Sequence, residues 1–176
     1  MNAAILMSIK PKWVEKILNG EKTIEIRKRF PKDYVGWVYI YCTKDKTTTI
    51  NLETLLFGNP KNAIRNGKVV ARFWCDKVEE INKVPLVVIG NYLKNACLSV
   101  EELQDYSRNY KYKTYAIHIT KLEIFDKPKE ISELHKIGYN DYCDMFNESP
   151  HILVPHFEDY KIIKAPQSWC YVEVVR

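Results

Sequence analysis

The sequence predicts an α+β domain in which mostly antiparallel strands form the core and short helices flank them. Runs of β-branched and aromatic residues recur at 37–42, 69–75 and 114–120, and turn-forming residues bound them. The helical patterns between these runs are short and carry their own start or stop signals. With 176 residues and no repeat or linker, the chain has the size of one domain with its own core. We therefore expect a single domain over residues 1–176.

The first thirty residues alternate between strand and helix patterns. Residues 3–9 are mostly apolar and predict a first strand. Pro11 suits a first helical turn and apolar residues follow at near-helical spacing, so residues 12–19 predict a short helix that ends at Gly20. Downstream the pattern changes to period two, which predicts a strand over residues 23–27.

The middle of the chain predicts two paired strands separated by an excursion. Residues 37–42 are a continuous run of β-formers and predict a central strand. Residues 69–75 predict the next strand, preceded by an Asn66-Gly67 turn and paired with the central strand as a meander. The polar residues 43–67 between them predict an excursion with one short helix.

The second half predicts short elements and a closing strand. A Ser99-x-x-Glu102 capping box predicts a helix to about residue 106 or 108. The other predictions, in chain order, are an apolar stretch at 85–89, a connection at 90–94, a strand at 114–125 that Pro128 breaks, a short helix at 131–137, an irregular segment at 139–157 and a last strand at 169–175.

The strand at 23–27 carries charge of both signs on one face. Thr23, Glu25 and Arg27 alternate with two isoleucines, so a carboxylate and a guanidinium lie side by side. Lys22, at the preceding turn, is close enough to reach the same face. Three interpretations stay open: a solvated edge that blocks sheet association, an internal ion network that fixes the register, or the floor of a polar pocket.

Residues 20–27 fit G-x-K-x-x-E-x-R, and this stretch resembles the signature of the ASCH domains, a branch of the PUA-like superfamily. The order of elements around it agrees: a preceding strand and helix, a following apolar strand and a later capped helix. The resemblance implies a PUA-like, mostly antiparallel β-barrel with flanking short helices, closed by the last strand against the first. It also implies a ligand pocket at the barrel mouth, with RNA or a modified nucleotide or nucleoside as partner.

The resemblance makes Lys22, Glu25 and Arg27 the predicted ligand-binding residues. Lys22 and Arg27 would take phosphate or carbonyl oxygens, while Glu25 would accept from an exocyclic amine or orient Lys22. We expect three further residues to join them: Ser8, Lys10 and Tyr41. The first two would face the same mouth if the first strand runs beside the motif strand.

Whether the chain is an enzyme stays open. Some small members of the family look like hydrolases of acetylated cytidine that use a lysine, a threonine nucleophile and a glutamate. In this sequence the lysine position falls on Lys22, the nucleophile on Glu25 and the glutamate near Ala96. Glu25 removes that nucleophile, yet it would still serve as a general base with Lys22 as stabiliser, in an amidohydrolase or ribonuclease. A third alternative is an accessory protein that binds a protein partner through residues 43–67.

Composition gives further indications about partners. The 27 Lys and Arg residues against 22 Asp and Glu leave a net charge of +5, a mild bias toward polyanions. Residues 108–113 interleave tyrosines with basic residues, which suits a flexible nucleic-acid strand or a solvated loop. His151 and His156, with Asp159, lack a third ligand at useful spacing. We expect no metal and no cofactor.

The remaining signals concern location and redox state. The five cysteines form no C-x-x-C pair, and most lie in or beside apolar runs, so we expect reduced, buried thiols. Residues 1–7 lack a basic leader, and their apolar run is too short to span a membrane. We expect a cytoplasmic protein with no membrane partner.

Overall fold

The structure is a computed structural model that describes residues 3–44, 66–81, 86–137 and 161–174. Contacts divide the chain into two compact units. One unit combines Met1–Pro11, Trp37–Ala71 and Phe125–Arg176, and the other combines Lys12–Gly36 and Arg72–Ile124. Most of the predicted excursion at 43–67 and the irregular segment at 139–157 lie outside the described residues, and the single-domain prediction stays a prediction.

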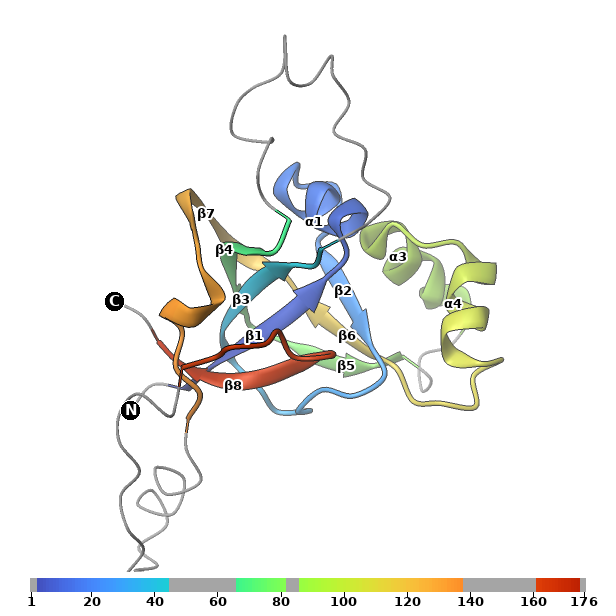
Figure 1. The fold of residues 1–176 in the computed structure, drawn as a ribbon. Helices are drawn as coiled ribbons and strands as arrows, with labels where there is room; N and C mark the ends of the chain where they lie inside the picture. Colours follow the sequence, from blue (N-terminus) through green and yellow to red (C-terminus); the bar gives the residue numbers. More distant parts are fainter. Residues whose placement is uncertain (1–2, 45–65, 82–85, 138–160, 175–176) are drawn as a thin grey trace, which may run out of the picture. The chain divides into compact units, whose positions relative to one another are not determined.

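The described residues form a mixed α+β fold, as predicted (Figure 1). The strands are β1 (Ala3–Ile9), β2 (Ile24–Arg27), β3 (Gly36–Cys42), β4 (Lys68–Cys75), β5 (Val78–Glu80), β6 (Tyr115–His118), β7 (Thr120–Lys129) and β8 (Trp169–Glu173). The helices are α1 (Pro11–Leu18), α3 (Leu86–Ala96), α4 (Val100–Ser107) and the short 3-10 helix η3 (Ile131–Glu133). Among these helices, none is long and apolar enough to cross a membrane.

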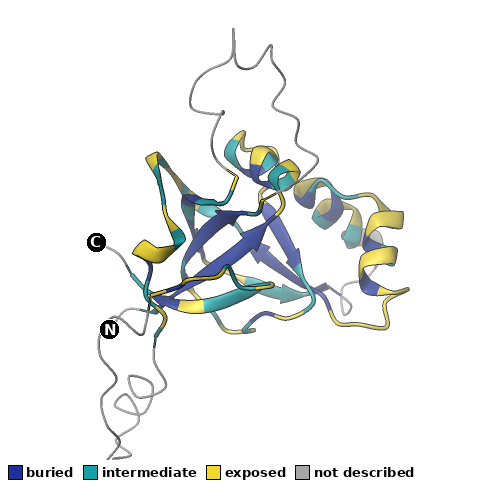
Figure 2. Cartoon of the chain, viewed as in Figure 1, coloured by how far each residue is buried: buried dark blue, intermediate teal, exposed yellow. Residues whose placement is uncertain are grey.

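The larger sheet has the strand order β7-β4-β3-β1-β8, and its central strands are buried on both faces (Figure 2). The predicted pairings of β3 with β4 and of β8 with β1 are confirmed. β1 runs parallel to β3, with Ile5 opposite Val38, and antiparallel to β8. The core on one face consists of Ala4, Leu6, Tyr39, Tyr41, Val69, Leu134, Ile162 and Val172.

The smaller sheet has the order β2-β6-β5, and both of its ladders are antiparallel. Ile24 and Ile26 of β2 pack with Ala116 of β6 against apolar residues of α3 and α4. The Ser99 capping box that begins α4 is present, with Ser99 Oγ accepting from the Glu102 N–H at 3.1 Å. One face of β2 is therefore fixed by core packing, and the opposite face is left to its charged residues.

Several predictions need correction. The segment predicted as an apolar stretch and a connection is the helix α3, in which Ile89, Leu93 and Ala96 recur at helical spacing and pack in the core. The single strand predicted at 114–125 is two strands in different sheets, β6 and β7, and β7 continues past Pro128 to Lys129. Because β7 is an edge strand, a missing N–H costs no ladder bond. The helix predicted at 131–137 shortens to η3, after which His135 and Lys136 form isolated bridges.

The remaining fold predictions concern barrel closure and the cysteines. In the described residues the ladders form two sheets, so closure into a barrel stays a prediction. The cysteines in the described ranges form no disulfide: Cys42 and Cys75 are buried, whereas Cys97 and Cys170 are partly exposed. Cys143 lies outside these ranges.

Candidate functional site

The turn between α1 and β2 positions the candidate site. Gly20 adopts a left-handed conformation, with φ of +77°, which favours glycine, and its N–H donates to Ile17 O at 3.0 Å. The N–H of Lys22 then donates to Lys16 O at 3.0 Å, which ties the chain back to the end of α1. The backbone of Lys22 is thereby held just before β2.

Alternation along β2 brings Glu25 and Arg27 together, as the sequence predicts. The isoleucines of β2 enter the core, so Glu25 and Arg27 share the other face. Arg27 Nε lies 3.0 Å from Glu25 Oε1. One oxygen of the carboxylate is therefore paired with the guanidinium.

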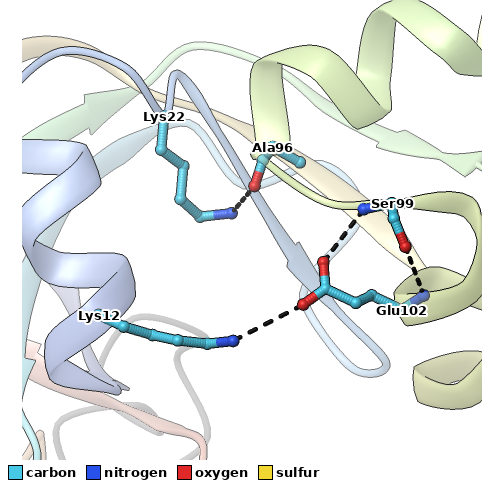
Figure 3. Close-up of polar contacts among 5 residues, drawn as sticks. All are labelled: Lys12, Lys22, Ala96, Ser99 and Glu102. Atoms are coloured by element: carbon cyan, nitrogen blue, oxygen red, sulfur yellow. Dashed lines mark hydrogen bonds and ion pairs between the residues drawn. The ribbon is translucent and has the colours of Figure 1, made fainter.

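Lys22 is enclosed by groups from three parts of the same unit. Its Nζ donates a hydrogen bond of 2.6 Å to the carbonyl of Ala96, at the end of α3 (Figure 3). It lies 3.4 Å from Glu25 Oε2 and 5.0 Å from the centre of the Trp13 ring. Only 3% of Lys22 is exposed, and this burial lowers its pKa, although the Glu25 charge opposes the shift.

The second carboxylate oxygen of Glu25, Oε2, has no hydrogen-bond donor among the described residues. Glu25 is 6% exposed, and its Oε2 accepts no hydrogen bond from the described residues. Lys22 Nζ lies within ion-pair distance of it, at 3.4 Å, while its short hydrogen bond of 2.6 Å goes to Ala96 O. A buried polar atom without a hydrogen bond is costly, and the described residues offer Oε2 no donor.

The cluster of Lys22, Glu25 and Arg27 is more deeply buried than the open mouth that the sequence predicts. Arg27 is the most exposed of the three, with 13% of its side chain accessible. Lys22 is buried because its Nζ donates a hydrogen bond to Ala96 O, which places the ammonium against the end of α3. The cluster keeps a net charge of +1 from two cations and one carboxylate.

Three crystal structures of one protein resemble this chain. They are ASCH from Zymomonas mobilis and two point mutants of it, one with tyrosine changed to phenylalanine and one with serine changed to alanine. For the tyrosine mutant the TM-score is 0.55, at 17% identity over 97% of this chain and 90% of that one. The chain has the ASCH fold. For the serine mutant the TM-score is 0.55, at 16% identity over 97% of this chain and 88% of that one. For the unmutated protein the TM-score is 0.50, at 18% identity over 97% of this chain and 87% of that one. No family model and no curated protein matches the sequence.

The ASCH fold confirms the resemblance that residues 20–27 show. Ala96 is a position at which this chain differs from the family pattern. The resemblance places a glutamate near this position. Here the backbone carbonyl of Ala96 meets Lys22, while the carboxylate next to the lysine comes from Glu25. Trp13 is a further neighbour that sequence reasoning missed, because nothing in its helical spacing shows that its ring faces a lysine.

Three predicted site residues belong to the other unit. The condition for placing Ser8 and Lys10 at the same mouth, a first strand beside the motif strand, is not met by the strand pairing: β1 pairs with β3 and β8, whereas β2 pairs with β6. Ser8 Oγ donates to Pro166 O at 2.6 Å, and Lys10 is exposed. Tyr41 is 7% exposed and packs in the core, where burial raises its pKa. Their role in ligand binding stays a prediction.

A second polar cluster on the smaller sheet is explained by its own contacts. His118, predicted to be a satisfied strand residue, lies with Nε2 2.7 Å from Glu79 Oε2, and Lys77 Nζ lies 2.8 Å from Glu79 Oε1. Within the described ranges, no group of three or more His, Cys, Asp or Glu side chains is arranged to hold a metal ion. His151, His156 and Asp159 lie outside those ranges.

Proposed function

We propose that this chain is an ASCH-type domain that binds nucleic acid or a modified nucleotide, in an RNA-related role, through Lys22, Glu25 and Arg27. The scaffold we propose is the PUA-like β-barrel that the resemblance implies. The observation that carries the proposal is Glu25 Oε2, a buried carboxylate oxygen that accepts no hydrogen bond from the described residues. An internal ion network built only to fix the register of β2 would gain stability by satisfying this oxygen.

The chemistry of the cluster matches the polar edge of a nucleobase and its phosphate. An exocyclic amine donates a hydrogen bond, so it suits Glu25 Oε2. Arg27 and Lys22 are donors without acceptor capacity, so they suit carbonyl or phosphate oxygens. The ligand would reach the cluster on the side of Arg27, whose side chain is the most exposed of the three.

The test compares nucleotides that differ in one amine. Adenosine monophosphate is paired with purine riboside monophosphate, and cytidine monophosphate with pyrimidin-2-one riboside monophosphate; the second member of each pair lacks the exocyclic amine. Calorimetric titration should show that in at least one pair the amine-bearing nucleotide binds about 10- to 100-fold tighter, the range of one hydrogen bond to a charged group. The preference should shrink in Glu25→Gln, because the amide is an uncharged acceptor.

The matched control is Glu79→Gln, which neutralises another glutamate of the same three-stranded sheet, outside the cluster. It should leave the preference for the amine unchanged. Equal affinity within both pairs, or no binding of any of the four nucleotides, would contradict the proposal and leave Lys22, Glu25 and Arg27 as a structural ion network.

A second candidate function is supported by the lowered pKa of Lys22 beside a carboxylate. A hydrolase acting on a modified nucleoside or on RNA would use Glu25 as the base that activates water and Lys22 to stabilise the developing negative charge. Incubation with acylated nucleosides and with RNA tests this alternative. Turnover that survives Glu25→Gln unchanged, or no turnover by the unmodified protein, would remove it.

A further inference from the structure

Tyrosines and basic residues from the ends of β2 and α4 form a surface. We define it by Lys28, Tyr106, Arg108, Tyr110 and Tyr112, all in the same unit as Glu25. The three tyrosines are 37%, 36% and 38% exposed, in chain order. More than a third of each residue's surface is open to solvent, so core packing does not fully explain these tyrosines.

The turn that carries most of this surface is held in an unusual conformation. Arg108, Asn109 and Tyr110 are three successive left-handed residues, with φ of 49°, 52° and 61°. Each such non-glycine residue costs about 1 kcal/mol or more, and the surrounding structure must hold it there. Ser107, which is fully buried, holds the turn in this conformation. Its Oγ accepts a hydrogen bond from the Tyr110 N–H at 3.0 Å, and its carbonyl accepts one from the Tyr112 N–H at 3.1 Å. The backbone of the turn is therefore held by Ser107.

The basic side chains of this surface sit on its rings. Lys28 Nζ is 4.6 Å from the centre of the Tyr106 ring and 5.3 Å from that of Tyr112. The Arg108 guanidinium is 5.4 Å from the Tyr112 ring, and its Nη1 donates to the Tyr112 hydroxyl at 3.2 Å. Lys28, which directly follows β2, thus contacts the ring of Tyr106 in α4 and the ring of Tyr112 in the turn after α4.

The basic residues of this surface form no ion pair with the acids of the described residues. In the part of the chain that the structure describes, no carboxylate lies within ion-pair distance of Lys28 or Arg108. Asp105, the nearest acidic residue before Arg108, contacts it through its backbone carbonyl. Cations over exposed aromatic rings, without acidic partners, supply both a charge for phosphates and flat faces for bases.

From these contacts we infer that Lys28, Tyr106, Arg108, Tyr110 and Tyr112 form a stacking surface for single-stranded nucleic acid, so that the ligand of this domain is a strand and not a free nucleotide. The inference rests on the proposed function in one respect, because it makes the nucleotide held by Glu25 one unit of that strand. A single strand is required, since bases in a duplex are stacked on each other and present no free face to a tyrosine. Tyr106 is close to both sites: Lys28 Nζ lies 4.6 Å from the centre of its ring, and its pKa, which burial raises, also responds to the charges of Arg27 and Glu25.

The experiment measures fluorescence anisotropy of labelled oligocytidine and oligoadenosine of about 12 nucleotides, in RNA and DNA form, and of the matching duplexes. Tyr112→Ala should weaken single-strand binding by about 5- to 100-fold, the range of one base–aromatic stack. Lys28→Gln should reduce the slope of log affinity against log salt by about 0.7, the value for one phosphate contact with a single strand. Both variants should bind the free nucleotides as the unmodified protein does.

The matched control is Tyr171→Ala, which removes a tyrosine of 37% exposure on β8, in the other unit. It should leave oligonucleotide binding unchanged. Unchanged oligonucleotide binding in both Tyr112→Ala and Lys28→Gln, equal binding of duplex and single strand, or no oligonucleotide binding at all would overturn the inference.

The two proposals fail in different ways. If Glu25→Gln abolishes the preference for amine-bearing nucleotides while Tyr112→Ala and Lys28→Gln change nothing, the proposed function stands and the stacking surface does not. If Tyr112→Ala weakens the oligonucleotide but no amine preference exists in the unmodified protein, the surface stands and the role of Glu25 fails. Melting curves of each variant establish that it is folded under the assay conditions.

Discussion

Neutralising Glu25 by Glu25→Gln should destabilise the protein by about 3–5 kcal/mol, because it leaves two cations buried without their shared carboxylate. Lys22 Nζ lies 3.4 Å from Oε2 and Arg27 Nε 3.0 Å from Oε1. At an effective dielectric constant of about 20, each contact amounts to about 5 kcal/mol of attraction before desolvation is counted. Lys22 has 2% of its side chain exposed, so little screening by water reduces its share.

Urea denaturation followed by circular dichroism measures this loss, and a second substitution identifies its origin. Lys22→Met removes the ammonium, so the double variant with Glu25→Gln no longer buries an unpaired lysine. It should lose at least about 1.5 kcal/mol less than the sum of the single losses, as groups in direct contact do. Glu79→Gln is the control: its side chain is 24% exposed and its partners Lys77 and His118 are 58% and 29% exposed, so its loss should stay near 1 kcal/mol.

Two outcomes would refute this reasoning. A loss below about 1 kcal/mol for Glu25→Gln would show that the three charges do not form a coupled buried network. Strictly additive losses in the double variant would show that Lys22 and Glu25 act independently, despite their distance of 3.4 Å.

Three further predictions concern single groups. Ser99→Ala should cost about 1 kcal/mol of unfolding free energy and Ser99→Gly only a few tenths, because the hydroxyl caps α4; equal losses would argue against the cap. Burial raises the pKa of Cys75 to about 11, so iodoacetamide at neutral pH should label the partly exposed Cys97 before Cys75, as read by mass spectrometry; similar rates at the two cysteines would contradict this. Burial lowers the pKa of Lys22 below its ordinary 10.5, so the unfolded chain binds more protons between the lowered value and 10.5. Through this window the unfolding free energy of the unmodified protein should rise with pH relative to Lys22→Met, and a flat or falling difference would be inconsistent with the burial.

Local rules predicted the candidate site better than they predicted its surroundings. Alternation along β2 follows directly from the residue order, so the side-by-side placement of Glu25 and Arg27 needs no tertiary information. The reach of Lys22 to the same carboxylate follows from its place at the turn that Gly20 makes. The family signature then predicted the ASCH fold from residues 20–27.

What the sequence did not predict depends on partners that are distant along the chain. The end of α3 meets Lys22 through a backbone carbonyl, which no side-chain pattern encodes, and α3 itself was missed because Gly90 and its β-branched neighbours weaken a helical signal. Pro128 lies in a strand only because β7 is at a sheet edge. The depth of the cluster, likewise, depends on where α3 packs and not on the composition of β2.

The most direct test of the central claim is a crystal structure of the protein with adenosine or cytidine monophosphate bound. The claim predicts that the exocyclic amine lies about 2.8–3.2 Å from Glu25 Oε2, a normal hydrogen-bond distance, with Arg27 or Lys22 on a carbonyl or phosphate oxygen. A nucleotide bound away from these three side chains, or Oε2 hydrogen-bonded to a donor of the protein itself, would contradict it.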